Sequence, residues 1–239
     1  MVDPKLLVEA GVHFGHRTDR WHPKMKPYIL EARNGVHLIN VEKTAQLLEK
    51  ACRFLREVAA RGEKVLFVGC KKQAQGLVEE LAKKTDSFYV KERWLGGMLT
   101  NLATIRKSVG RLRWIEELEA KGLLEQMPKK EVSSLRREAA RLRRSLDGIR
   151  DMERLPGAVI LVDVVKEAIA VHEARRCRVP SIGIVDTNGN PELVDIPIPG
   201  NDDSIRSLRA LLEPLAQAIL EGRSEGSPHE SSELATVEP

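Results

Sequence analysis

The chain has 239 residues, of which 42% are hydrophobic and 31% charged, and a formal net charge of +4. These values predict a sizeable core, in one domain with an appendage or in two small domains. The chain has no run of about 18 apolar residues, which argues against a transmembrane helix. Its N-terminus lacks the basic and apolar segments of a secretory signal, so we expect a cytoplasmic protein without a membrane partner.

The N-terminal region combines a short helix with a loop rich in rings and cations. Asp3 can cap a helix that begins at Pro4 and ends near Gly11. The loop over 12–28 holds three of the six histidines and several aromatic and basic side chains. Such loops commonly bind unstacked bases, although the same rings could simply pin the loop to the core.

The next stretch reads as a hairpin followed by alternating helices and strands. Asn34 and Gly35 predict a two-residue turn between strands at 28–32 and 36–40. The elements expected after it are a helix over 41–61 capped by Asn40, a buried strand over 64–69, a helix ending at Lys84 and a short strand over 88–90.

Two long charged helices then interrupt the alternation, and each has a narrow apolar seam. Residues of the second seam, from Val132 to Ile149, are spaced by three and four. Gly122 and Pro128 can turn the chain back between the two helices, so an antiparallel hairpin is predicted. An arm over 100–120 would project roughly 30 Å.

The positive charge of the chain is concentrated in this hairpin. Residues 101–150 hold thirteen Lys or Arg against seven acids, a net of +6, so the rest of the chain nets −2. A cationic rod suits a phosphate backbone, because each neutralised phosphate releases counterions. The surface of a solvated coiled coil has a similar composition, and both interpretations stay open at this point.

Apolar strands alternate with helices again after the hairpin. We expect strands over 158–164, 180–185 and 193–196 and helices over 166–176 and 202–220. Continuous apolar strands between helices favour an α/β fold with a doubly wound parallel sheet of about five strands, into which the coiled-coil hairpin is inserted. The predicted division is a discontinuous domain at 1–99 and 152–221, the hairpin at 100–151, and a disordered acidic tail at 222–239 with net charge −3.

Motifs for catalysis are not found. The turn from Gly69 to Gly76 matches neither GxGxxG nor a P-loop, and the sequence has no HExxH motif or nucleophile elbow. Lys71 and Lys72 could still hold a phosphate at a helix N-terminus. We therefore predict no catalytic residue and no small-molecule substrate.

A divalent metal is the one cofactor that the residues suggest, and none is required. His16, Asp186 and Asp203 could meet where the carboxyl ends of parallel strands gather, and imidazole with carboxylates can bind a divalent ion. The alternative assigns Asp202 to a helix N-cap and Asp186 to an Asx turn.

Seven segments together resemble the signature blocks of the bacterial small ribosomal subunit protein two family. They occur in the family's order, and the resemblance extends from about residue 5 to 223. The segments are EAGVHFGH at 9–16, WHPKM at 21–25, RNGVH at 33–37, LFVG at 66–69, RWLGGMLTN at 93–101, VDTN at 185–188 and IPGNDDSIR at 198–206. His22 and Asn190 depart from the family, which usually has Asn and Asp there.

The resemblance implies a flavodoxin-like domain with a protruding coiled coil and no enzymatic activity. It also implies binding to small-subunit rRNA where head meets body, contact with other small-subunit proteins, and support for docking of ribosomal protein one. The match does not fix which residues contact RNA. We predict these RNA contacts: His16, Arg17, Lys24, Lys26, Arg93, Asn101, Arg136, Arg137 and Arg144.

Two hypotheses from other classes remain for comparison. A nucleotide-binding α/β enzyme without a recognisable phosphate loop would bind a mononucleotide near residues 69–76. A coiled-coil interaction module would bind a protein through its isolated hairpin. The missing phosphate motif argues against the first, and the motif blocks outside the hairpin argue against the second.

Overall fold

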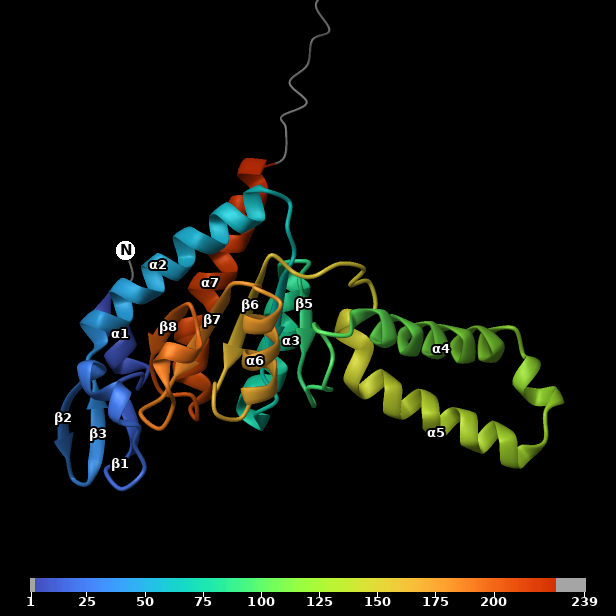
Figure 1. Cartoon of the computed structure of the whole chain (residues 1–239), viewed down its shortest axis with the longest axis horizontal. Helices are drawn as coiled ribbons and strands as arrows, with labels where there is room; N and C mark the ends of the chain where they lie inside the picture. The colour runs from blue at the N-terminus through green and yellow to red at the C-terminus, as the bar shows by residue number, and fades with distance from the viewer. Residues whose placement is uncertain (1–2, 227–239) are drawn as a thin grey trace, which may run out of the picture.

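A five-stranded parallel sheet lies at the centre of the computed structural model, which describes residues 3–226 (Figure 1). Its strands, in sheet order, are β5 (Phe88–Val90), β4 (Val65–Val68), β6 (Ala158–Val162), β7 (Ser181–Val185) and β8 (Ile196–Pro199). All four neighbouring pairs are parallel. In chain order this is 2-1-3-4-5, the flavodoxin-like arrangement, so the predicted α/β fold is confirmed.

The strands read as continuous apolar runs because both faces of the sheet are covered. Val65 and Phe67 of β4 face one core, whereas Leu66 and Val68 face the other. The first core is closed by α2 (Val41–Ala60), α3 (Lys72–Lys84) and α7 (Ile205–Gly226), and the second by α6 (Ala168–Arg176) and the root of the hairpin.

Helix caps in the N-terminal half follow the sequence signals. The Asp3 side chain accepts a hydrogen bond from the Lys5 amide at the start of α1 (Pro4–Glu9). The Asn40 side chain accepts from the amides of Glu42 and Lys43 at the start of α2. These predictions are confirmed, because a cap depends only on residues within one turn.

A separate three-stranded antiparallel sheet forms from the N-terminal region, with strand order β1-β3-β2. Its strands are β1 (Phe14–Arg17), β2 (Ile29–Arg33) and β3 (Val36–Ile39), and η1 (Pro23–Tyr28) precedes β2. Asn34 and Gly35 have φ of 52° and 76°, as a type I′ turn requires. The prediction of a loop over 12–28 was wrong at β1, because its ladder partners lie about twenty residues away in β3.

The two charged helices are α4 (Leu102–Ala120) and α5 (Lys129–Leu146), joined through η2 (Leu123–Gln126), and they project from the sheet domain (Figure 1). Ion pairs of Glu116 with Arg143 and Glu119 with Arg136 show that the two helices run antiparallel. A small core lies between the distal parts of the helices: Leu112, Ile115, Leu124, Leu135 and Ala139. The proximal seam instead joins the second core of the sheet.

The C-terminal elements differ from the prediction at several of their ends, since β6 stops at Val162 and α6 starts at Ala168. Strand β8 begins at Ile196 rather than Leu193, because the Asn190 side chain starts the 3-10 turn η4 (Pro191–Leu193) before it. Helix α7 begins at Ile205, not Asp202, and continues to Gly226.

Residues 222–226, predicted as the start of a disordered tail, are therefore helical. A Cβ at Gly222 would lie 2.2 Å from the Arg56 carbonyl oxygen, so this glycine serves close packing of α7 against α2. Residues 227–239 of the predicted tail lie outside the described part of the chain. Among the described helices, none has the length and apolarity needed to cross a membrane.

Candidate nucleic-acid interface and metal centre

Strand β1 places its two predicted contacts on different sides. The Arg17 side chain is 76% exposed and lies 3.3 Å from Asp19. The His16 side chain turns inward instead, where its Nδ1 lies 3.1 Å from Asp186 Oδ2. Arg17 is thus exposed but shares its charge with Asp19, whereas His16 belongs to a carboxylate cluster.

Four further predicted contacts lie in η1 and in the segment that leads to α4. Lys24 forms an ion pair with Glu192, so its charge is partly neutralised. Lys26, Arg93 and Asn101 are exposed, and within residues 3–226 their side chains have no ion pair. These three residues therefore present polar groups to solvent.

The three predicted arginines of the hairpin differ in their partners. Arg136 lies 3.3 Å from Glu119, and Arg144 lies 3.2 Å from Glu92 although 74% of its side chain is exposed. Arg137 donates to the Ser133 carbonyl oxygen and has no acidic partner in the described chain. Two of the three arginines thus have acidic partners within the protein, one across the hairpin on α4 and one in the segment that follows β5.

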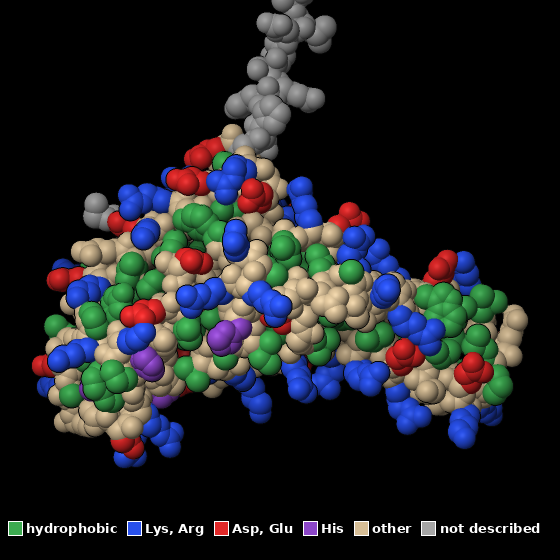
Figure 2. Space-filling model, in the orientation of Figure 1, with side chains coloured by type: hydrophobic (Ala, Val, Ile, Leu, Met, Phe, Trp, Pro, Cys, Tyr) green, Lys and Arg blue, Asp and Glu red, His purple; other side chains and the backbone are tan. Residues whose placement is uncertain are grey.

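Five further cations of the hairpin belong to the cationic rod expected from the sequence but not to the nine predicted RNA contacts, and they have no ion pair among the described residues. Two of them, Lys129 and Lys130, lie exposed at the start of α5. Arg106 and Lys107 are exposed on α4, and Arg141 is exposed on α5. Arg137, Arg141 and Arg144 are spaced by four and three, which places them on one face of α5. Figure 2 shows Lys and Arg side chains along the edge that runs from the sheet domain to the hairpin.

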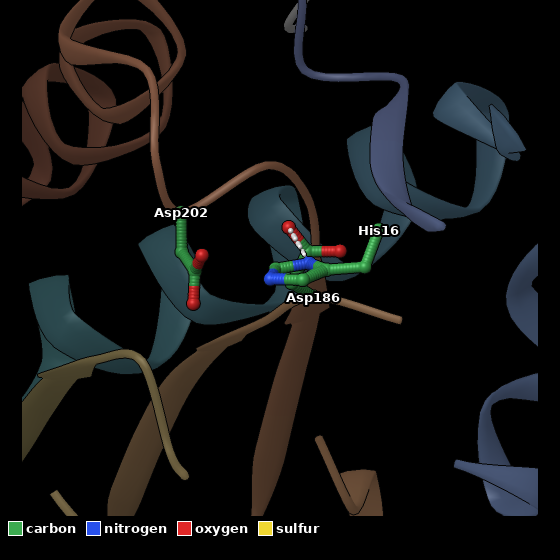
Figure 3. A group of neighbouring side chains, drawn as sticks. All are labelled: His16, Asp186 and Asp202. Carbon is green, nitrogen blue, oxygen red and sulfur yellow. Dashed lines mark ion pairs between the residues drawn. The ribbon is translucent and has the colours of Figure 1, made fainter. Parts of the chain in front are cut away.

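A cluster of His16, Asp186 and Asp202 forms at the carboxyl edge of the parallel sheet (Figure 3). Asp186 follows β7, Asp202 precedes α7, and His16 reaches in from β1. One ligand atom from each residue can be chosen so that all lie within 4.8 Å of one another. The hydrogen bond to Asp186 raises the pKa of His16, against the effect of burial.

The third carboxylate of this cluster is Asp202, which is 1% exposed. Its Oδ1 accepts a hydrogen bond of 2.7 Å from the Lys71 ammonium, but its buried Oδ2 has no hydrogen-bond partner among residues 3–226. Burial and the charges of Asp186 and Asp163 raise the pKa of Asp202 to about 7. An unpartnered carboxylate oxygen at this position is a ready ligand for a cation.

Lys71 is the main positive charge inside the cluster. Its Nζ lies 2.9 Å from Asp163, 2.7 Å from Asp202 and 2.9 Å from Asp203. Burial alone would lower the pKa of Lys71, but hydrogen bonds to Asp202 and Asp203 outweigh it and raise that pKa. The cluster holds four carboxyl groups, including that of Asp186, and one ammonium, so acidic groups outnumber basic ones there even when His16 is counted as a cation.

The structure corrects the local roles predicted for these aspartates. The N-cap role assigned to Asp202 was wrong, because the Asn201 side chain accepts hydrogen bonds from the amides of Asp203 and Ser204 before α7 begins. Asp186 opens a turn through its backbone, since its carbonyl oxygen accepts from the Gly189 amide. The predicted Asx turn was wrong, because the Asp186 side chain accepts from the Thr187 amide one residue on, whereas an Asx turn closes two residues on. Asp203 lies at the rim, 56% exposed, with its Oδ2 3.7 Å from His16 Nε2.

The turn after β4 does not offer a phosphate site. The Cys70 amide donates to the Glu167 carboxylate at 2.9 Å, and the Lys71 ammonium is surrounded by acids. A Cβ at Gly69 would lie 2.9 Å from Val78, so this glycine allows α3 to pack closely. Carboxylates therefore engage the two groups that would meet a nucleotide phosphate.

Comparison with known proteins gives a family and several relatives. The family model described as Ribosomal protein S2 matches residues 7–222. Small ribosomal subunit protein uS2c of Porphyra purpurea is 51% identical over 217 residues, which are 91% of this chain and 90% of the relative. The protein of that name from Rhodomonas salina is 50% identical over 235 residues, 97% of each chain. Small ribosomal subunit protein uS2 of Synechococcus sp. (strain JA-2-3B'a(2-13)) is 52% identical over 220 residues, 92% of this chain and 83% of the relative.

Proposed function

Because the chain belongs to the ribosomal protein S2 family, we propose that it binds small-subunit rRNA where head meets body and supports the docking of ribosomal protein one. Family membership makes it a structural protein of the small ribosomal subunit that acts in translation, is located in the ribosome and is not an enzyme. Assembly with rRNA and other ribosomal proteins follows from that membership.

The observation that carries the RNA proposal is the set of hairpin cations without acidic partners in the described chain. Arg106, Lys107, Arg137 and Arg141 are exposed and form no ion pair with an acid among the described residues, although the charge of Arg141 contributes to lowering the pKa of the nearby Glu138. Such cations bind phosphates most favourably, because the contact releases counterions and no ion pair within the protein has to be broken first. Lys26 and Arg93 extend the same chemistry to the sheet domain, where Asn101 adds an uncharged polar group. Four other predicted contacts would have to share their charge with a neighbouring acid: Arg17 with Asp19, Lys24 with Glu192, Arg136 with Glu119 and Arg144 with Glu92.

Salt-dependent association tests this proposal. The double variant R137E/R141E should bind less tightly to small subunits lacking this protein, and its affinity should depend less steeply on salt, by about one unit of log–log slope per lost phosphate contact. K50E/R53E on α2 makes the same change in net charge at exposed positions and serves as the control. Equal binding of both variants and the wild type at moderate salt would contradict an RNA contact by the hairpin.

The docking of a protein partner is supported by apolar side chains around the three-stranded sheet. Phe14 is 50% exposed, Trp21 39% and Leu30 65%. Exposed groups of this kind in one region indicate a protein contact. Pull-down of purified ribosomal protein one by the intact protein should weaken for F14A/L30A and persist for I169A, an equally exposed apolar change on α6. Unchanged capture by F14A/L30A would remove this surface from the proposal.

A divalent cation at His16, Asp186 and Asp202, with Asp203 at the rim, is the second part of the proposal. It is favoured by the unpartnered Asp202 Oδ2 and by the excess of carboxylates around it. Nitrogen and oxygen donors together suit zinc or a similar transition metal. Titration of the chelator-treated protein with Zn²⁺ should give about one equivalent bound, and D202N should abolish this binding while D19N does not. Wild-type protein that binds no Zn²⁺ after this treatment would contradict the site.

A further inference from the structure

No packing contact within the described chain explains why residue 110 is a glycine. It lies in the interior of α4, is exposed, and a Cβ built on it would meet nothing within 4 Å. After proline, glycine is the least favourable residue in a helix interior. Such a glycine leaves the helix backbone open to close approach by an outside group, and the neighbouring side chains decide whether one binds there.

Trp114 lies one turn further along the same face of α4. Its side chain is 42% exposed, although it is the largest apolar side chain of the hairpin. The Arg111 guanidinium lies 4.3 Å from the centroid of its ring, and Glu138 fixes that guanidinium through hydrogen bonds of 3.2 and 3.1 Å. The indole is thus held in place and keeps exposed surface available for stacking.

The charges beside these two residues indicate what binds there. Lys107 is three residues before Gly110 and shares its face, and Arg106 flanks it. Both cations are exposed and have no acidic partner in the described part of the chain. Figure 2 shows hydrophobic and basic side chains together on the outer part of the hairpin. A single-stranded RNA segment fits all three features: its bases can stack on the exposed indole, its backbone can approach the helix at Gly110, and its phosphates can pair with the two cations.

We propose that Lys107, Gly110 and Trp114 form an RNA-docking notch on α4, in which the ribose-phosphate backbone passes over Gly110 and an unpaired base stacks on Trp114. This inference rests on the proposed rRNA binding and adds a base-stacking contact to it. It is distinct from the basic face of α5 that carries Arg137 and Arg141.

Competition for small subunits that lack this protein tests the notch. W114A should compete about 5- to 150-fold less well than the wild type, as expected for loss of one stacked base, and W114F should restore part of the binding. G110A should raise the midpoint of thermal unfolding by about 2–4 °C, because alanine favours the helix, and yet bind less well. G76A is the matched control: Gly76 in α3 is also exposed with open space at Cβ, so it should gain stability and bind normally.

The outcomes separate this inference from the proposal on which it rests. If W114A and G110A compete as well as the wild type while R137E/R141E does not, the notch is wrong and rRNA binding stands. Ultraviolet cross-linking of the assembled subunits should attach a nucleotide to the peptide that contains Trp114. A cross-link from that peptide to another protein, without a nucleotide adduct, would overturn the notch as an RNA site. Failure of the wild type to bind the subunits would overturn both.

Discussion

The buried carboxylate of Glu173 in α6 accepts a hydrogen bond of 3.1 Å from the indole N–H of Trp94. It also accepts from the amides of Gly97, Leu99 and Thr100 and from the Thr100 hydroxyl, at 2.7 to 3.1 Å. Burial alone would raise the pKa of Glu173, but these hydrogen bonds outweigh it and lower that pKa. One side chain thereby fixes the segment that leads into the hairpin.

Replacement of this residue should show how strongly the hairpin root depends on it. Glu173→Gln keeps the shape but turns an amide group toward donors, so the free energy of unfolding should fall by about 2–4 kcal/mol in urea titration. Glu57→Gln on the exposed side of α2 should change it by less than about 0.5 kcal/mol. Equal stability of the two variants would show that the backbone donors find other partners.

Glu116 makes the stability of the hairpin depend on acid pH. Its carboxylate accepts hydrogen bonds from Arg150 and Arg143, and these lower the pKa of Glu116 to about 2. Because the folded pKa lies below the ordinary value of 4.5, the stabilisation is complete above pH 4.5 and disappears as pH falls toward 2.

Substitution of Glu116 should reproduce this loss at neutral pH. Glu116→Gln should cost about 1–3 kcal/mol in chemical denaturation at pH 7 and almost nothing near pH 2. Glu117→Gln is the control and should change stability much less, since Glu117 is exposed and its ion pair within the described chain is with Lys121. A difference between wild type and Glu116→Gln that does not vary with pH would contradict the argument.

Lys71 should be needed to neutralise the carboxylate cluster when no cation is present. Lys71→Met leaves Asp163, Asp202 and Asp203 without their ammonium and should destabilise the protein by about 3–5 kcal/mol in chelator. Added Zn²⁺ should restore part of this loss in a thermal melt. Lys72→Met, an exposed neighbour, should melt like the wild type with and without Zn²⁺. A Lys71→Met protein as stable as wild type in chelator would contradict a net negative charge in the cluster.

The distal core of the hairpin should be sensitive to a cavity. Leu112 is fully buried between α4 and α5, so Leu112→Ala should cost about 2–5 kcal/mol. Because this core is separate from those of the sheet, hydrogen exchange should increase in α4 and α5 and remain slow in β4 and β6. Exchange that increases equally in the sheet would show that the hairpin and the sheet unfold as one unit.

The sequence by itself determined those features of the fold that depend on residues close together in the chain. The caps Asp3 and Asn40, the Asn34-Gly35 turn and the apolar strands β4, β6 and β7 all follow from local geometry and burial. The narrow apolar seams likewise predicted the antiparallel pair of helices α4 and α5. The seven motif blocks indicated the family, which the comparisons confirm.

Tertiary structure alone decided what depends on distant partners. Strand β1 exists because β3 supplies its ladder, and Asp202 is buried while Asp203 lies at the rim in the turn that the Asn201 side chain holds before α7. The register of α4 against α5 decides that Arg136 has an acidic partner and Arg137 has none in the described chain. Charge patterns along a sequence count ionic groups, but only the packed structure fixes which of them lie within a few ångströms of an opposite charge.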